Sequence, residues 1–366
     1  MIFNIFKQDF LGPIQKVQSI VEKKSTFPFL QNVRIEAKGG QIKIFATDME
    51  VGLRDQVEAS VQVEGCITVS AQKLFEVLKE LGDEIVHFEV DQNNWIKIEC
   101  GLSNFKLVGM SDADFPSMME VKDDALVEVD AFILENLANK SMYAATMDPN
   151  KHMYRGVLFK VNGNVLSMVA TDGHRLAKVT MKSEENLPDM EVIIPRKGIT
   201  ELLKIISTGA EKIALGIVQN HIVFRLNEQY TIASLIDSQF PDFERVIPQK
   251  NTYNIRINRP SFYDICKRVS IFSDIKTHTI SMTFGNGVLE VKGSTPEYGE
   301  AKDQIVVDYE GEELKLNFNV IYILETLRVF ECEEIFMRFN EGGPVIFEPV
   351  EKDSVDYLAL IMPMIV

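Results

Sequence analysis

QIKIFATDMEVG spans residues 41–52, and a related stretch, NVLSMVATDGHRLA, spans residues 164–177. Both contain Ala-Thr-Asp, at residues 46–48 and 170–172, an offset of 124 residues. A motif that recurs at one long period indicates a chain built from repeated structural units.

Other patterns repeat at nearly the same interval. The Phe-Pro pair at residue 115 recurs at residue 240, and the Met-Pro pair at residue 362 is a candidate third copy. Apolar residues follow the i, i+3, i+4, i+7 spacing of a half-buried helix three times, each time between segments with strand-like patterns. These stripes are Leu74, Val77, Leu78 and Leu81; Ile199, Leu202, Leu203 and Ile206; and Val320, Ile323, Leu324 and Leu327.

An earlier helix opens each unit, so the sequence predicts six helices. Turn-rich stretches place unit boundaries near Glu120 and Pro248. We therefore expect an α+β fold of three tandem domains, each ordered helix, strands, helix, strands; the alternative is an ordinary α+β protein in which the stripes coincide by chance. The predicted domains are residues 1–120, 121–247 and 248–366, and the predicted helices are residues 7–24, 70–81, 130–141, 195–207, 258–272 and 319–330.

Three similar units in a row leave one unpaired sheet edge at each end. Such an edge favours pairing with another chain, and joining two chains head to tail would pair both edges and close a ring. The sequence therefore favours a six-domain ring of two chains.

The charge is distributed unevenly between helices and the rest of the chain. The net charge is −16, yet the six predicted helices hold 14 Lys and Arg against 9 Asp and Glu. A ring with these helices lining its hole and its sheets outside would attract phosphates inward and repel them from its wall. The alternative is that Lys and Arg simply favour helical surfaces.

Several protein classes are not indicated. Cys66, Cys100, Cys266 and Cys332 are scattered, which is typical of reduced thiols rather than disulfides or a zinc site. The N-terminus does not resemble a signal peptide, and no apolar run approaches the roughly 18 residues of a membrane span. We expect a cytoplasmic protein without membrane contact, metal or cofactor.

The segments YRGVLF (154–159), ATDGHRLA (170–177), VIIPRKG (192–198), FPDFERVIP (240–248) and MPM (362–364) resemble the bacterial DNA polymerase III beta subunit family, the beta sliding clamps. KKSTFPFLQN (23–32) and IFATDMEVG (44–52) resemble it too. The resemblance implies a non-catalytic processivity factor, a head-to-tail homodimer around duplex DNA of any sequence. It also implies as partners a clamp loader, the replicative polymerase alpha subunit, and other polymerases and repair proteins that carry a clamp-binding peptide.

The same resemblance implies positions for a peptide pocket, a dimer interface and, at Lys24 and His152, DNA contacts, whereas the other DNA-facing residues are expected from the charge of the predicted helices. A peptide pocket between the second and third domains would use Thr171, Gly173, His174, Arg175, Leu176, Pro241, Arg245, Val246, Asn319, Tyr322, Met362, Pro363 and Met364. The dimer interface would use Phe105, Leu107, Ile271 and Phe272, although Phe105 fits a core position equally well. Expected DNA-facing residues are Lys23, Lys24, Lys73, Lys79, Lys140, His152, Arg196, Lys197, Lys204, Arg259, Lys267 and Arg268.

Two other functions remain as alternatives. Asp172 and His174 are the best candidates for an acid–base pair in an enzyme, but residues two apart on a turn point apart, so a structural role is favoured for His174. Phosphate loops and nucleophile elbows are absent from the sequence. The second alternative is a repeat scaffold that binds proteins without enclosing DNA.

Overall fold

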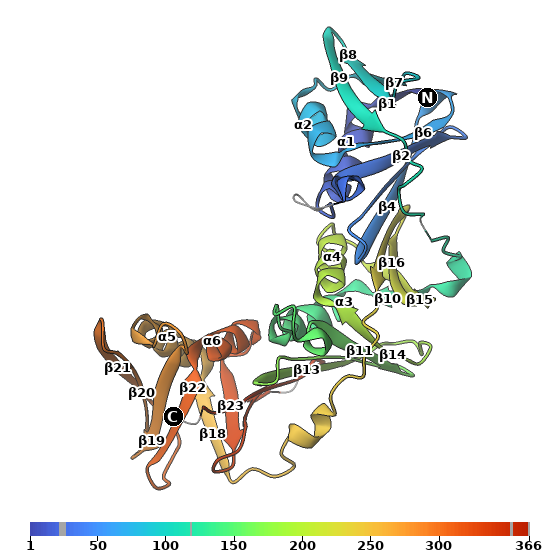
Figure 1. Cartoon of the computed structure of the whole chain (residues 1–366). Helices are drawn as coiled ribbons and strands as arrows, with labels where there is room; N and C mark the ends of the chain where they lie inside the picture. Colours follow the sequence, from blue (N-terminus) through green and yellow to red (C-terminus); the bar gives the residue numbers. More distant parts are fainter. Residues whose placement is uncertain (22–26, 118, 352–353, 365–366) are drawn as a thin grey trace. The chain divides into compact units, whose positions relative to one another are not determined.

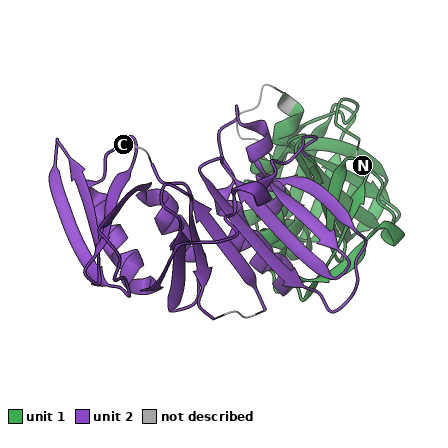
Figure 2. Ribbon diagram, turned by 90° about the horizontal axis from the view of Figure 1, so that it is seen from below, with its two compact units in different colours: residues 1–131, 200–235 green, residues 132–199, 236–366 purple. Residues whose placement is uncertain are grey.

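The computed structural model describes residues 1–21, 27–117, 119–351 and 354–364. These residues form two compact units, one of residues 1–131 with 200–235 and one of residues 132–199 with 236–366 (Figure 2). A 13-stranded sheet lies in the first unit, and sheets of eight and four strands lie in the second. No helix in the described ranges is long and apolar enough to cross a membrane.

One order of elements, β-α-β-β-β-β-α-β-β-β, occurs three times along the chain, with one extra strand (β5) in the first copy (Figure 1). The first copy comprises β1 (Ile2–Phe6), α1 (Lys7–Gln18), β2 (Asn32–Lys38), β3 (Gln41–Thr47), β4 (Val51–Glu58), β5 (Ser60–Val63), β6 (Gly65–Ser70), α2 (Ala71–Glu80), β7 (Ile85–Val90), β8 (Trp95–Cys100) and β9 (Ser103–Met110). The second comprises β10 (Val127–Asp130), α3 (Ala131–Ser141), β11 (Gly156–Asn162), β12 (Val165–Thr171), β13 (Arg175–Lys182), β14 (Met190–Pro195), α4 (Arg196–Ile206), β15 (Lys212–Val218), β16 (His221–Leu226) and β17 (Gln229–Ser234). The third comprises β18 (Tyr253–Asn258), α5 (Arg259–Val269), β19 (Thr279–Gly285), β20 (Val288–Thr295), β21 (Gly299–Val306), β22 (Leu314–Asn319), α6 (Val320–Val329), β23 (Glu334–Phe339), β24 (Val345–Pro349) and β25 (Asp356–Ile361).

Short 3-10 helices occur in the segments between these elements. They are η1 (Pro28–Gln31), η2 (Asp123–Ala125), η3 (Met142–Ala144), η4 (His152–Tyr154), η5 (Phe243–Val246) and η6 (Ser270–Phe272).

All six predicted helices are present, and the threefold repeat is confirmed, but two details of the prediction were wrong. Each copy begins with a strand before its first helix, which the prediction omitted. The first helix ends at Gln18 rather than at residue 24, because the amides of Ser19 and Ile20 donate to carbonyls only three residues back and tighten the last turn. Lys23 and Lys24, which were expected to close this helix, lie outside the described residues.

The helices are amphipathic, and their buried faces hold the repeated stripes. In α2, Leu74 and Leu78 are buried, and α1 packs against α2. In α6, Ile323 and Leu327 are buried, and α5 packs against α6. Polar side chains cap three of the helices and so satisfy an amide at each N-terminus, an interaction of about 1 kcal/mol. These caps are Ser70 to the amide of Lys73, Asn258 to that of Ser261, and Asn319 to that of Ile321.

Consecutive copies are joined edge to edge by antiparallel strand pairs. In the first unit β4 pairs with β17, with Gly52 opposite Ile232. In the second unit β13 pairs with β25, with Leu176 opposite Leu360. Both pairs join the third strand of one copy's first meander to the last strand of the next copy. The same pair of equivalent strands therefore joins the first copy to the second and the second copy to the third.

Candidate functional site

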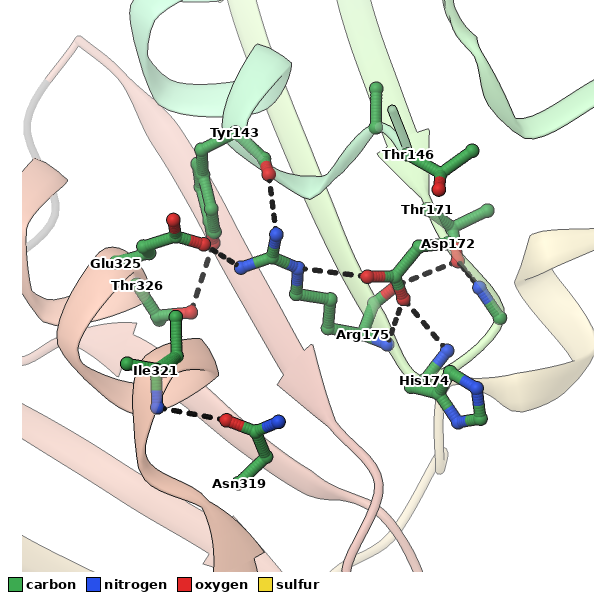
Figure 3. A network of polar contacts seen from close by, with 12 residues as sticks. Tyr143, Thr146, Thr171, Asp172, His174, Arg175, Asn319, Ile321, Glu325 and Thr326 are labelled. Carbon is green, nitrogen blue, oxygen red and sulfur yellow. Dashed lines mark hydrogen bonds and ion pairs between the residues drawn. The ribbon is translucent and has the colours of Figure 1, made fainter. Parts of the chain in front are cut away.

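The turn between β12 and β13 is fixed by two side chains (Figure 3). Thr171 Oγ1 donates to the carbonyl of Arg175 at 2.6 Å and accepts from the amide of Gly173 at 3.1 Å. Asp172 Oδ1 accepts from the amides of His174 at 2.9 Å and Arg175 at 3.1 Å. Gly173 has a φ of +91°, a conformation that glycine adopts without strain. Thr171 and Asp172 therefore fix the shape of this turn, and Gly173 adopts it without strain.

Arg175 connects this turn to the third copy. Its Nε donates to Asp172 Oδ2 at 3.1 Å, one Nη donates to the carbonyl of Tyr143 at 2.7 Å, and the other pairs with the carboxylate of Glu325 on α6 (Figure 3). The guanidinium also lies 4.5 Å from the centre of the Tyr322 ring. Because Arg175 and Asp172 are both buried, loss of either charge would destabilise this network.

An apolar groove of about 160 Å³ opens beside the turn, and we call it the C-terminal groove. It lies over a buried cluster that contains Leu158, Val169 and Ile346. Aromatic and aliphatic side chains with a few polar groups are typical of a binding site. The groove is lined by Tyr154, Thr171, Gly173, His174, Arg175, Leu176, Pro241, Asp242, Phe243, Val246, Leu360 and Met362.

The structure brings together eight of the thirteen residues predicted for the peptide pocket: Thr171, Gly173, His174, Arg175, Leu176, Pro241, Val246 and Met362. The other five are not part of its lining. Arg245 pairs with Asp242 at 2.6 Å, Tyr322 stacks on Arg175, and Asn319 caps α6. The amide of Met364 donates to the carbonyl of Asn317 at 2.7 Å, so Pro363 and Met364 continue past the groove along β22.

Four lining residues were absent from the prediction: Tyr154, Asp242, Phe243 and Leu360. Three of them lie inside the motifs YRGVLF and FPDFERVIP, which carried the signal. Phe243 stacks edge-on against Phe240, with ring centres 6.2 Å apart. A rule that follows every apolar residue of the FPDFERVIP motif would have found Phe243.

The geometry does not support acid–base chemistry at this turn. The Asp172 carboxylate accepts hydrogen bonds from two backbone amides and from the Arg175 guanidinium, so it is not directed at the His174 ring. Among the described residues, no three His, Cys, Asp or Glu side chains gather to hold a metal ion.

The predicted DNA-facing residues fall into two groups. Lys73, Lys79, His152, Lys204, Lys267 and Arg268 are exposed, with Lys73, Lys204 and Arg268 in ion pairs to Glu76, Glu201 and Asp303. The others that the structure describes are less available. Lys140 is buried and pairs with Glu331 at 3.0 Å, while Arg196 donates to the carbonyls of Met142 and Ala145. Arg259 donates to the carbonyl of Cys332, and Lys197 is half-buried.

Burial also shifts the pKa of one of these residues, Arg196. It lowers the pKa of the Arg196 guanidinium, because desolvation disfavours the charged form. Structural roles therefore account for Lys140, Arg196 and Arg259, which sequence alone could not separate from the exposed cations.

The predicted interface residues lie at two sheet margins, one in each unit. Phe105 and Leu107 are half-buried on β9, and residues 103–108 of this strand pair only with β8 among the strands that the structure describes. Ile271 is 74% exposed in η6, and Phe272 beside it is half-buried. The η6 turn packs against β20 and β21, and β21 is the edge strand of its sheet.

The three copies of one order of elements are joined in pairs by shared sheets. They define a three-domain clamp fold of mixed helices and sheets. The N-terminal, central and C-terminal domains of the DNA polymerase III beta subunit match residues 1–119, 128–242 and 244–365. The chain therefore belongs to the DNA polymerase III beta subunit family.

Known proteins resemble it over their whole length. The beta sliding clamp of Haemophilus influenzae is 30% identical, with full coverage of both chains. The DNA polymerase III subunit beta of Pseudomonas aeruginosa superposes with a TM-score of 0.93 at 30% identity, and a structure of the P. aeruginosa clamp bound to griselimycin does so at 0.91, each with full coverage of both chains. The chain is a sliding clamp of DNA replication that serves DNA polymerase III, and it is not an enzyme.

Proposed function

We propose that two copies of this chain close head to tail into a ring around duplex DNA, and that the C-terminal groove binds short peptides of polymerases, a clamp loader and repair proteins. The domains of this ring are residues 1–120, 121–247 and 248–366. The observation that carries the proposal is a third pair of strand edges that matches the two junctions already formed within the chain.

The third junction follows from the repeat. The β4·β17 and β13·β25 pairs each use equivalent strands of consecutive copies. The remaining equivalents are β21 of the third copy and β9 of the first. Among the described strands, β21 pairs only with β20, and most of β9 pairs only with β8. A second copy of the chain would supply the missing partner at each end and close the circle.

The register of this third junction follows from the registers of the two junctions within the chain. Gly52 pairs with Ile232 and Leu176 with Leu360, and the equivalent pair is Glu300 with Lys106 of the second copy. Phe105 would lie opposite Ala301, and Leu107 opposite Gly299. Opposite charges directly across a strand pair stabilise it by roughly 0.2–1 kcal/mol. The apolar contacts and this charge pair both support the interface.

Charge reversal tests the register. We expect Glu300→Lys to weaken the dimer, because it places two cations opposite each other at both junctions. Lys106→Glu should weaken it too, and the double variant should restore it, as measured by sedimentation velocity over a dilution series. A double variant that dissociates as readily as either single variant would contradict the register, and a wild-type monomer at micromolar concentration would contradict the ring.

The helices supply the charge for the inner surface. The six observed helices hold 12 Lys and Arg against 7 Asp and Glu, although the chain carries a net charge of −16. With these helices turned inward, exposed Lys73, Lys79, Lys204, Lys267 and Arg268 would face the phosphates. A topological link needs few tight phosphate contacts, so the ring can slide.

Retention on DNA tests encirclement directly. We expect the clamp, loaded on nicked circular DNA, to stay bound through gel filtration and to be lost once a restriction enzyme linearises the circle. A scaffold that binds DNA at its surface would be indifferent to the cut. Equal retention on circular and linear DNA would therefore refute the ring.

The C-terminal groove offers an adaptable apolar surface to a peptide. Leu176, Val246 and Met362 line it, and methionine adapts readily to different anchors. Changing Met362, which lines the groove, to Gln should abolish binding of a polymerase alpha-subunit peptide while sedimentation still shows a dimer. Unchanged peptide affinity would remove this assignment.

A further inference from the structure

The turn between β3 and β4 in the first unit has the same hydrogen bonds as the turn beside the C-terminal groove. Thr47 Oγ1 donates to the carbonyl of Val51 at 3.1 Å and accepts from the amide of Met49 at 3.0 Å. Asp48 Oδ1 accepts from the amides of Glu50 and Val51 at 3.0 and 2.7 Å. The two turns have the same four hydrogen bonds. Residues 49 and 50 therefore occupy the positions that residues 173 and 174 occupy in the other turn.

The strand that follows repeats the equivalence. The amide of Ser234 donates to the carbonyl of Glu50 at 2.9 Å, as the amide of Met362 donates to that of His174 at 2.8 Å. The two junctions have the same turn, the same strand pairing and the same hydrogen bond after the turn. We therefore expect a groove beside the first turn as well.

A groove is present there, and we call it the N-terminal groove. Its volume is about 530 Å³, larger than the 160 Å³ of the C-terminal groove. Phe45, Met49 and Ile232 contribute its apolar surface. The groove has room for several side chains of an extended peptide.

Met49 points to a binding role because its backbone is unfavourable for methionine. It has a φ of +75° where the other turn has Gly173 at +91°. Its side chain is 62% exposed, so packing within the chain does not repay this strain. Residues with strained backbone cluster at active sites and ligand-binding sites.

The two grooves differ in charge: two carboxylates, Glu50 and Glu120, line the N-terminal groove, whereas Arg175 and Asp242 line the C-terminal groove. Glu50 occupies the position of His174, and Glu120, at the same offset of 125 as the Phe-Pro motif, occupies that of Arg245. Within the described part of the chain, neither Glu50 nor Glu120 forms an ion pair. His221 also lines this groove, and its Nδ1 is buried without a hydrogen-bond partner among the described residues. The N-terminal groove therefore combines apolar surface with unmatched carboxylates and an unused polar ring atom.

We propose that the N-terminal groove is a second peptide-binding site, specific for a linear segment of a partner protein that carries an apolar anchor next to lysine or arginine. The apolar anchor would contact Met49, Phe45 and Ile232, and the cation would approach Glu50 and Glu120. The peptide nature of the ligand rests on the function proposed for the equivalent C-terminal groove, whereas the preference for cations rests on the residues of this groove alone.

A matched pair of peptides tests the proposal on the full-length dimer. One labelled peptide has the sequence Gly-Leu-Phe-Lys-Arg-Gly and the other Gly-Leu-Phe-Glu-Glu-Gly. Binding is measured by fluorescence anisotropy and located by NMR of ¹³C-methyl methionine. We expect saturable binding of the basic peptide with at least tenfold preference over the acidic one, and a shift of the Met49 methyl signal.

Variants separate this site from the C-terminal groove. Glu50→Gln with Glu120→Gln should weaken the basic peptide at least fivefold, and Met49→Gly, which removes a strained side chain without harming the turn, should weaken it too. Met362→Gln should leave it unchanged. No saturable binding at millimolar peptide, or a shift of the Met362 signal without one at Met49, would overturn the proposal. Loss of polymerase-peptide binding in Met362→Gln would concern the C-terminal groove only.

Discussion

The two Thr-Asp turns have the same backbone but are attached to their surroundings by different chemistry. Beside the C-terminal groove, Arg175 pairs with Asp172 within the turn and links the turn to Tyr143 and Glu325. At the equivalent position the first turn has Val51, and aromatic packing of Phe45 against Phe115, with ring centres 5.8 Å apart, replaces the polar network. The difference shows that Thr and Asp determine the turn, while the residue three positions after the Asp, Val51 or Arg175, determines how the turn is anchored to its surroundings.

The largest effect should come from removing the polar anchor. Arg175→Ala leaves the buried carboxylate of Asp172 without its cationic partner and the carbonyl of Tyr143 without the Arg175 donor, so we expect a loss of about 3 kcal/mol in the free energy of unfolding. Chemical denaturation followed by circular dichroism measures this loss.

Val51→Ala is the matched control, because it removes only buried methyl groups at the equivalent position and should cost about 1–2 kcal/mol. Equal losses in the two variants would mean that the polar network contributes no more than ordinary packing, and the contrast between the turns would be lost.

An intermediate effect should be common to both turns. Thr47 and Thr171 are equally buried, and each hydroxyl makes the same two backbone hydrogen bonds. Thr47→Val and Thr171→Val keep the side-chain shape and remove only these bonds, so each should cost about 1–2 kcal/mol.

Thermal unfolding of the two valine variants supplies the measurement. The control is Thr283→Val on β19, a half-buried position whose hydroxyl makes no hydrogen bond among the described residues. A loss at one turn but not at the other would show that the shared geometry is maintained by different forces.

Much of the fold followed from the sequence because apolar spacing reports burial directly. The stripes of α2, α4 and α6 predicted these helices to within one residue at each end. The opening strands β1, β10 and β18 escaped prediction because each runs directly into a helix, whose apolar spacing dominates the local pattern. Local pattern also could not show that α1 stops at Gln18, because a tightened last turn decides this.

The candidate site was partly predictable for a different reason. Motif residues such as Gly173 and Leu176 were found because one short segment contains them. Leu360 was missed because the groove forms where β25 meets β13, which is a property of the tertiary structure, whereas Phe243 lies inside a motif that had already supplied Pro241 and Val246. The roles of Lys140 and Arg196 were missed likewise, since their partners are Glu331 and the carbonyls of η3.

The smallest effects should be opposite in sign at the two turns. Met49→Gly relieves a positive φ at an exposed position and should stabilise the chain by about 0.5–1 kcal/mol, after the added backbone entropy of glycine in the unfolded state is deducted. Gly173→Ala should destabilise it by about 1 kcal/mol, and through backbone conformation alone, because an added Cβ would meet only Tyr154, at 3.9 Å. Differential scanning calorimetry of both variants resolves shifts of this size. If Met49→Gly proved destabilising, the methionine side chain would be contributing to the fold, and its exposed, strained conformation could no longer be attributed to a ligand.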